Sequence, residues 1–294
     1  IIVYESLTCS HCAHFHKDVY PKLKKDFIDN GLAKIEFRSF PLDLAALNAS
    51  KIAHCKNDGK SDLLHFLFEN QKKWVRGETI EDINPANGEI IAHIPKSSSK
   101  DIESAVESAD LARHSWSKLS LEDRADWLDK IANALEAKAD EIASLESLDT
   151  GKPISLAKAV DASRSITNFR FFAQFSKDFS VENFEMDDAT NHVLLKPVGI
   201  AGLITPWNLP LYLLSWKIAP AIVMGNTVVA KPSELTPLTA NLLSETLHEI
   251  NFPAGVVNIV HGLGSEAGQA IVEHPKVNLI SFTGGTLTGK KVAE

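Results

Sequence analysis

The sequence is poor in cysteine, and its cysteines lie near one end. They are Cys9, Cys12 and Cys55, and none follows in the long remainder of the chain. Any chemistry that depends on a thiol is therefore confined to the first 55 residues.

Long apolar runs are also absent. A membrane-spanning helix needs about 18 consecutive apolar residues. The most apolar region, 203–230, is interrupted by Asn208, Pro210, Lys217 and Pro220, so we expect no membrane span. The chain starts with Ile1 rather than Met and shows no signal-peptide pattern, which favours a start that has been cut.

Negative charge is in excess and unevenly distributed. The 294 residues carry 30 Lys+Arg and 38 Asp+Glu, for a net charge of −8, whereas residues 1–82 carry 12 of each sign. The excess acid lies beyond residue 82 and argues against nucleic acid or an anionic membrane as a partner. The length allows two domains, and the shift in charge suggests two pieces of different origin.

The first 80 residues contain a dithiol motif at the start of a predicted helix. The segment "SLTCSHCAHF" separates Cys9 from Cys12 by two residues, one of which is His11. A strand is predicted at 1–4, and apolar residues at helical spacing follow Cys12. The amino end of a helix and a neighbouring His stabilise a thiolate at Cys9, and Cys12 can resolve a mixed disulfide.

Two other interpretations of the dithiol stay open. With His14 and His16 the motif could form half a zinc site, although no second ligand pair follows at finger spacing. The thiols could instead form a structural disulfide or be idle. Cys55 is expected to be a small buried apolar residue.

Residues 1–75 resemble the thioredoxin-like thiol-disulfide oxidoreductases of the periplasmic Dsb type. The resemblance rests on "SLTCSHCAHFH", "EFRSFPLD" and "LLHFLFENQKKWV". It implies Cys9 as the nucleophile and Cys12 as the resolving thiol. Such domains continue with a cis-proline loop, a β-hairpin and a last helix, and no such segment follows Trp74. A partial thioredoxin-like domain is therefore expected over residues 1–80.

The remainder of the chain predicts an α/β domain over residues 81–294. "INPANGEIIAHIP" (83–95) is typical of a strand, a turn and a strand, and a capping box at Ser120 and Asp123 begins a long helix that ends at Gly151. Four predicted strands, "GIAGLI", "NTVVAKP", "GVVNIV" and "NLISFTG", each precede a predicted helix. This alternation predicts a doubly wound parallel sheet, whose ligands bind beyond the carboxyl ends of the strands.

Two glycine patterns follow strands but identify little by themselves. The segment Gly262–Gly268 has one spacer too many for the dinucleotide fingerprint. The segment Gly284–Lys290 is similar to a phosphate loop, but Lys291 stands where Mg²⁺ coordination needs Ser or Thr. We therefore predict neither a nucleoside-triphosphatase nor a metal site here.

The strand ends carry a more specific signal. "TPWNLPL", "VVAKPSE" and "SFTGGT" follow successive strands and, with "INPANGEIIA", resemble the aldehyde dehydrogenase superfamily over residues 81–294. The resemblance implies a doubly wound domain that binds NAD or NADP, an aldehyde substrate and a homo-oligomer. "FRFFAQF" and "FTGGT" are similar to the branch that acts on muconic semialdehydes.

The resemblance also implies roles for single residues. Asn208 would donate its side-chain amide to the oxyanion formed from the aldehyde, and Lys231 and Glu234 would hold the adenosine ribose. The other implied cofactor contacts are Gly264 at the adenine, Gly285 at the pyrophosphate, Thr283 and Lys217 at the nicotinamide end, and the backbone of Trp207. Taken singly, Asn208 could cap a helix, Lys231 could be a solvated charge and Trp207 could be a core residue.

Aldehyde dehydrogenases oxidise through a cysteine thiolate, and a Glu-activated water releases the acid. In the family both motifs follow the "FTG-x-T" helix, inside which this chain stops at Glu294, and residues 81–294 contain no cysteine. We therefore expect a truncated, inactive dehydrogenase. The alternatives are a thiol-disulfide oxidoreductase acting through Cys9 and Cys12, and a non-catalytic NAD-binding module.

The two resemblances imply different compartments, the cytoplasm for the dehydrogenase and the periplasm for the dithiol protein. The stretch that joins the two pieces, "RGETIEDIN" (76–84), has no Gly/Ser/Pro linker composition. These observations favour a chimeric or truncated reading frame.

Overall fold

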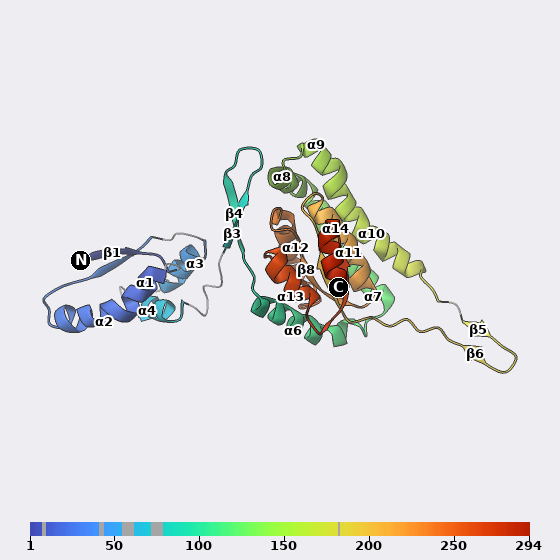
Figure 1. Cartoon of the computed structure of the whole chain (residues 1–294), viewed down its shortest axis with the longest axis horizontal. Coiled ribbons are helices and arrows are strands. Elements are labelled where there is room, and N and C mark those ends of the chain that lie inside the picture. Colours follow the sequence, from blue (N-terminus) through green and yellow to red (C-terminus); the bar gives the residue numbers. More distant parts are fainter. Residues whose placement is uncertain (8–9, 41–43, 55–61, 72–78, 182) are drawn as a thin grey trace. The chain divides into compact units, whose positions relative to one another are not determined.

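The computed structural model describes residues 1–7, 10–40, 44–54, 62–71, 79–181 and 183–294. Its chain divides into two compact units, Ile1–Arg76 and Gly77–Glu294 (Figure 1). Cys9 and Cys55 lie outside the described residues. Within the described ranges, no helix has the length and apolar character needed to cross a membrane.

The first unit contains a two-stranded parallel sheet and several short helices. Its elements are β1 (Ile2–Glu5), α1 (Ser10–His14), η1 (Phe15–Val19), α2 (Tyr20–Leu23), η2 (Lys24–Ile28), β2 (Glu36–Ser39), α3 (Leu44–Ala53) and α4 (Asp62–Glu69). Leu7, Ala49, Ala53, Leu64 and Phe68 form its small core. The strand predicted at 1–4 and the helix predicted after Cys12 are confirmed.

His16 lies buried in the core of this unit. Its Nε2 lies 2.6 Å from Glu5 Oε2, and its Nδ1 lies 2.8 Å from His65 Nδ1. Its ring stacks on Phe68. Among the described residues no group of three or more His, Cys, Asp and Glu could hold a metal ion, but Cys9, on which the half-zinc interpretation depends, lies outside them.

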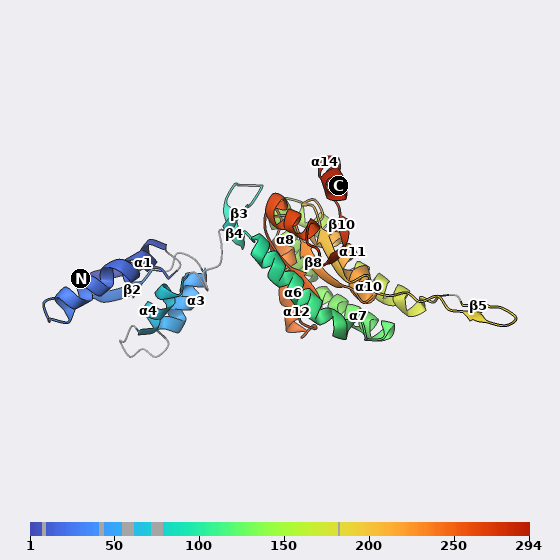
Figure 2. The same cartoon turned by 60° about the horizontal axis from the view of Figure 1, so that its bottom comes forward.

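The second unit begins with an antiparallel hairpin and a layer of helices. These elements are β3 (Thr79–Ile83), β4 (Ile90–Pro95), α6 (Ser99–Trp116), α7 (Leu121–Ala137), α8 (Ala139–Thr150), α9 (Ile154–Leu156), η3 (Ala157–Ala162) and α10 (Ser163–Asp178). A second hairpin, β5 (Phe184–Glu185) and β6 (Thr190–Asn191), projects beyond the end of α10 in both views (Figures 1 and 2).

The predicted strand–helix alternation then follows. Its elements are β7 (Ile200–Ile204), α11 (Pro210–Val223), β8 (Thr227–Lys231), α12 (Leu238–Glu249), β9 (Val257–Ile259), η4 (Gly264–Gly268), α13 (Gln269–Val272), β10 (Val277–Phe282) and α14 (Thr286–Ala293). The four strands pair in parallel in the order β10-β7-β8-β9, which confirms the α/β class and the parallel sheet.

Helices cover both faces of this sheet, as alternation along a central strand requires. Val229 of β8 packs in the smaller core with α6 and α13. Its neighbours Val228 and Ala230 point the other way, into the larger core formed with α7, α8, α10, α11 and α12. The sheet is thus buried on two sides, and its strand ends are left for a site.

The single helix predicted from Leu121 to Gly151 is wrong, because the chain breaks at Lys138 into α7 and α8. The capping box is confirmed, since Ser120 Oγ accepts the Asp123 amide at 3.0 Å. Beyond the break, Leu148 of α8 is exposed. Gly151 ends α8 in the left-handed conformation, as predicted.

The carboxyl end of α11 is held by two side chains from the helical layer. Arg124 Nε donates to Val223 O at 2.7 Å, and Trp116 Nε1 donates to Ile222 O at 2.8 Å. Both carbonyls belong to the last turn, where a helix has unpaired acceptors and favours a positive charge. These contacts fix the far end of the helix that follows the "TPWNLPL" loop.

Arg124→Ala should therefore lower the free energy of unfolding by roughly 2 kcal/mol, because buried carbonyls lose charged donors. Arg113→Ala is the matched control, since Arg113 is half-exposed and pairs with Asp110 on its own helix. Urea unfolding followed by tryptophan fluorescence measures both. Equal stabilities of the two variants would show that Arg124 does not anchor α11.

Candidate functional site

The structure brings the predicted site residues to one edge of the sheet. Thr205–Asn208 follow β7, Lys231–Glu234 follow β8, His261–Gly264 follow β9, and Thr283–Gly285 follow β10. Because the strands are parallel neighbours, their carboxyl ends meet at one rim. Such a rim is where open α/β sheets bind ligands.

Lys231 and Glu234 form a buried ion pair at the end of β8. Lys231 Nζ donates to Glu234 Oε2 at 2.9 Å and to Pro232 O at 2.8 Å. Lys231 is only 2% exposed, so its interpretation as a solvated charge is wrong. Burial lowers the pKa of Lys231. Burial alone would raise the pKa of Glu234, but Lys231 and the backbone amides of Glu234 and Gly264 together hold that pKa below its usual value.

The end of β9 adds a histidine and small residues to the same corner. Burial lowers the pKa of His261 to about 4, and the Lys231 charge adds to the effect, so the imidazole is neutral near pH 7. A methyl group on Gly268 would lie 3.5 Å from the Lys231 side chain. Gly264 and Gly285 are exposed, and a methyl group on either would meet no atom within 4 Å. Space remains beside both backbones.

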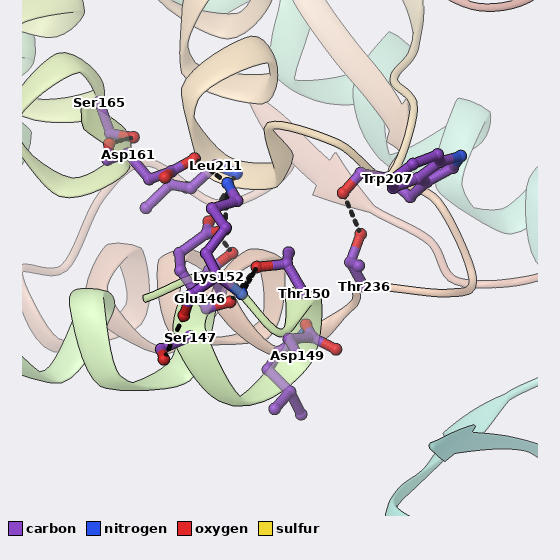
Figure 3. A network of polar contacts seen from close by, with 12 residues as sticks. Glu146, Ser147, Asp149, Thr150, Lys152, Asp161, Ser165, Trp207, Leu211 and Thr236 are labelled. Atoms are coloured by element: carbon purple, nitrogen blue, oxygen red, sulfur yellow. Dashed lines mark hydrogen bonds and ion pairs between the residues drawn. The ribbon is translucent and has the colours of Figure 1, made fainter. Parts of the chain in front are cut away.

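Trp207 and Asn208 lie exposed in the loop after β7. Leu209, rather than Asn208, is the residue before the first turn of α11, and no side-chain cap is formed there. Trp207 is 57% exposed. The helix-cap and core interpretations of these two residues are therefore wrong. Thr236 Oγ1 donates to Trp207 O at 3.4 Å, which links this loop to the loop after β8 (Figure 3).

Lys217 points from α11 toward β10. Its Nζ donates to Ser281 Oγ at 2.8 Å, and burial lowers its pKa. Lys217, Ser281 and Thr283 line a cavity of about 580 Å³ whose other walls are mostly apolar, including Trp216 and Leu279. The nicotinamide-end residues implied by the resemblance thus lie together, next to an apolar space.

Helix α8 contributes two buried acids to this region that the sequence analysis did not identify. Glu146 Oε1 accepts from the Leu211 amide at 3.1 Å and from Thr239 Oγ1 at 2.9 Å. Asp149 Oδ2 accepts from the Leu238 amide at 3.0 Å. The carboxylates therefore satisfy the first turns of α11 and α12, where helices offer unpaired N–H groups and positive charge.

Burial controls the ionisation of these acids. Burial raises the pKa of Glu146 to about 7, despite its hydrogen bonds. Burial likewise raises the pKa of Asp149 to about 8, and the adjacent Asp82 adds to the effect. Lys152 compensates in part, with its Nζ at 2.6 Å from Asp161 Oδ1 and 3.9 Å from Glu146 Oε2 (Figure 3).

Comparison with known proteins identifies two family matches. The aldehyde dehydrogenase family matches residues 74–294, and a family described as thioredoxin matches residues 1–144. The two matches overlap between residues 74 and 144.

Individual relatives match about three quarters of the chain. The chain is 46% identical to 2-hydroxymuconic semialdehyde dehydrogenase of Pseudomonas sp. (strain CF600), covering 79% of this chain and 49% of that protein. It is 48% identical to 2-aminomuconic semialdehyde dehydrogenase of Danio rerio, with the same coverage. The NAD+ complex of aldehyde dehydrogenase from Bacillus cereus is 38% identical with a TM-score of 0.71, covering 74% of this chain and 45% of that chain. The chain thus spans about half the length of these relatives.

Proposed function

The chain belongs to the aldehyde dehydrogenase family over residues 74–294, and we propose that its second unit binds NAD⁺ at the carboxyl ends of β7, β8, β9 and β10. The observation that carries the proposal is the buried Lys231–Glu234 pair, a cation and a carboxylate held together at the sheet rim. These two groups can donate to and accept from the vicinal hydroxyls of a ribose.

The rest of the rim fits the other parts of a dinucleotide. Gly264 leaves room for an adenine against the backbone, and Gly285 precedes the amino end of α14, where N–H groups favour a pyrophosphate. Thr283 and Lys217 border the cavity proposed for the nicotinamide. When bound, the cofactor would accept a hydride from the substrate. The exposed Asn208 would donate an N–H to an oxyanion at that end.

We propose an aldehyde that carries a carboxylate as the substrate of the complete enzyme. Support comes from relatives named for 2-hydroxymuconic and 2-aminomuconic semialdehydes, at 46% and 48% identity. Because the chain spans about half of those relatives, turnover depends on residues that belong to the other half of the family's sequence.

Binding of NAD⁺ tests the proposal directly. Quenching of tryptophan fluorescence should be saturable, and Lys231→Ala should weaken binding at least about tenfold, because the ribose hydroxyls lose a charged donor. Lys100→Ala removes an exposed lysine at the start of α6 and should leave the affinity unchanged. Absence of saturable quenching in the unmodified protein would contradict the proposal.

The carboxylate of Glu234 favours NAD⁺ over NADP⁺, because it would repel the 2′-phosphate of NADP⁺. Lys231 is already paired with this carboxylate and would not be free to bind the phosphate. Glu234→Gln removes this repulsion and keeps an acceptor. We expect the dissociation constant of NADP⁺ divided by that of NAD⁺ to fall by about tenfold or more. Removing one repulsive charge contact is worth at least about 1.4 kcal/mol. An unchanged ratio would assign the preference to other residues.

A thiol-disulfide oxidoreductase acting through Cys9 and Cys12 is the second proposed function, because the thioredoxin family matches residues 1–144. Cys12 lies in α1, and Cys9 lies outside the described residues. The chain should reduce an artificial disulfide in the presence of a dithiol, and Cys9→Ser should abolish the activity. We further propose a fusion of two reading frames, which a single uninterrupted DNA read across the coding region tests.

A further inference from the structure

Glu146 occupies an unusual position for a carboxylate. It is fully buried, and it comes from α8, which contributes none of the rim loops. One of its oxygens, Oε1, accepts two hydrogen bonds, from the Leu211 amide and from the Thr239 hydroxyl. A single atom is thus shared by the first turns of α11 and α12.

These two first turns continue directly from the two loops of the proposed cofactor site. Leu211 lies three residues after Asn208, and Thr239 lies five residues after Glu234. Asp149 adds a parallel contact from α8 to the Leu238 amide. At the rim itself, the loops are linked by the long hydrogen bond from Thr236 to the Trp207 carbonyl and by the Thr205 amide, which donates to the Lys231 carbonyl at 3.2 Å.

The second oxygen of Glu146, Oε2, is buried and accepts no hydrogen bond from the described part of the chain. Lys152 Nζ lies 3.9 Å from Oε2 and is itself held by Asp161 at 2.6 Å (Figure 3). The carboxylate can therefore not rotate freely without leaving a buried amide unpaired, which is costly. Glu146 thus connects the first turns of α11 and α12, which follow the two loops.

We propose that Glu146 is a positioning residue that sets the distance between the Trp207–Asn208 loop and the Lys231–Glu234 loop, so that one dinucleotide can reach both. This inference rests on the proposed NAD⁺ function. It separates two parts of the ligand, because the adenosine half would contact the Lys231–Glu234 loop and Gly264, whereas the nicotinamide half needs the Trp207–Asn208 loop in register.

The test compares NAD⁺ with AMP by isothermal titration calorimetry. Glu146→Ala should raise the dissociation constant of NAD⁺ about tenfold, and that of AMP less than about threefold. Glu146→Gln keeps an oxygen acceptor and should bind NAD⁺ within about threefold of the unmodified protein. Glu141→Ala, on the exposed face of α8, is the matched control. Equal weakening of AMP and NAD⁺, or no weakening of either, would overturn the proposal.

Thr239→Val removes only the hydrogen bond between Glu146 and α12 and keeps the side-chain volume. If Glu146→Ala does not fold, Thr239→Val decides: a selective loss of NAD⁺ affinity supports the positioning role, and an unchanged NAD⁺-to-AMP ratio refutes it. If the unmodified protein binds neither nucleotide, the proposed function fails. Amide hydrogen exchange of residues 207–217 then tests the positioning role of Glu146 without a ligand. Faster exchange there in Glu146→Ala, rescued in Glu146→Gln, would support the connection, and unchanged exchange would reject it.

Discussion

Given NAD⁺ and a muconic semialdehyde, the 294-residue chain should bind the cofactor and form no NADH. Oxidation in the family implied by the sequence proceeds through a cysteine thiolate, and no cysteine follows Cys55. Removal of a nucleophile costs several orders of magnitude in turnover even when the surrounding site is intact. Asn208 and the Lys231–Glu234 pair would still bind substrate and cofactor, but no hydride would be transferred.

The cysteines of the first unit do not alter this expectation. Cys12 lies in α1, against the small core of that unit, and a catalytic thiol must be held within about 0.5 Å of its productive position. Absorbance of NADH over many hours measures the prediction. A complete relative serves as the positive control, and the triple variant Cys9→Ser, Cys12→Ser, Cys55→Ser tests any residual rate. NADH formation in that triple variant would disprove the cysteine argument.

A second experiment tests whether the rim binds the cofactor in a productive position. Joining the second half of a semialdehyde dehydrogenase after Glu294 supplies a nucleophile to the rim described above. Turnover in the joined protein, reduced at least about tenfold by Lys231→Ala, would show that the rim binds cofactor productively. Turnover that does not respond to Lys231→Ala would place the cofactor elsewhere.

The strands and the motifs at their ends could be predicted from the sequence because both are local properties. Alternating apolar residues predict a buried strand, and the segment after it must lie at the sheet rim in a parallel α/β domain. Thr205–Asn208 and Lys231–Glu234 reach the rim for that reason. Their burial was harder to predict, since a lysine at a strand end is usually solvated, whereas Lys231 is 2% exposed.

The acids of α8 could not be predicted in the same way, because their role depends on tertiary contacts. Charged residues in a helix usually face water, so the sequence alone does not distinguish Glu146 and Asp149 from solvated acids. A signal does exist in their spacing. Ile142, Glu146 and Asp149 follow at intervals of four and three residues, so the two acids share the buried face of an apolar residue. Acids on the apolar face of a helix are a reason to look for helix amino ends nearby.

The pH dependence of stability should reveal these acids, with a sign opposite to that of an ordinary ion pair. Burial raises the pKa of Glu146 from 4.5 to about 7, so between these values the folded state binds a proton that the unfolded state has lost. The free energy of unfolding should therefore fall as pH rises through this interval, by on the order of 3 kcal/mol from Glu146. Asp149, whose pKa burial raises to about 8, should extend the decline to higher pH.

Glu146→Gln separates this effect from every other titration in the unit. The amide keeps an acceptor for the Leu211 amide and cannot ionise, so the decline between pH 4.5 and 7 should become shallower and stability at pH 7.5 should rise. Urea unfolding at a series of pH values measures the difference, with Glu141→Gln as the exposed control. Identical pH slopes for Glu146→Gln and the unmodified protein would mean that Lys152, held by Asp161, keeps Glu146 ionised throughout. A steeper slope would mean that the carboxylate stabilises the amino ends of α11 and α12 more than burial costs it.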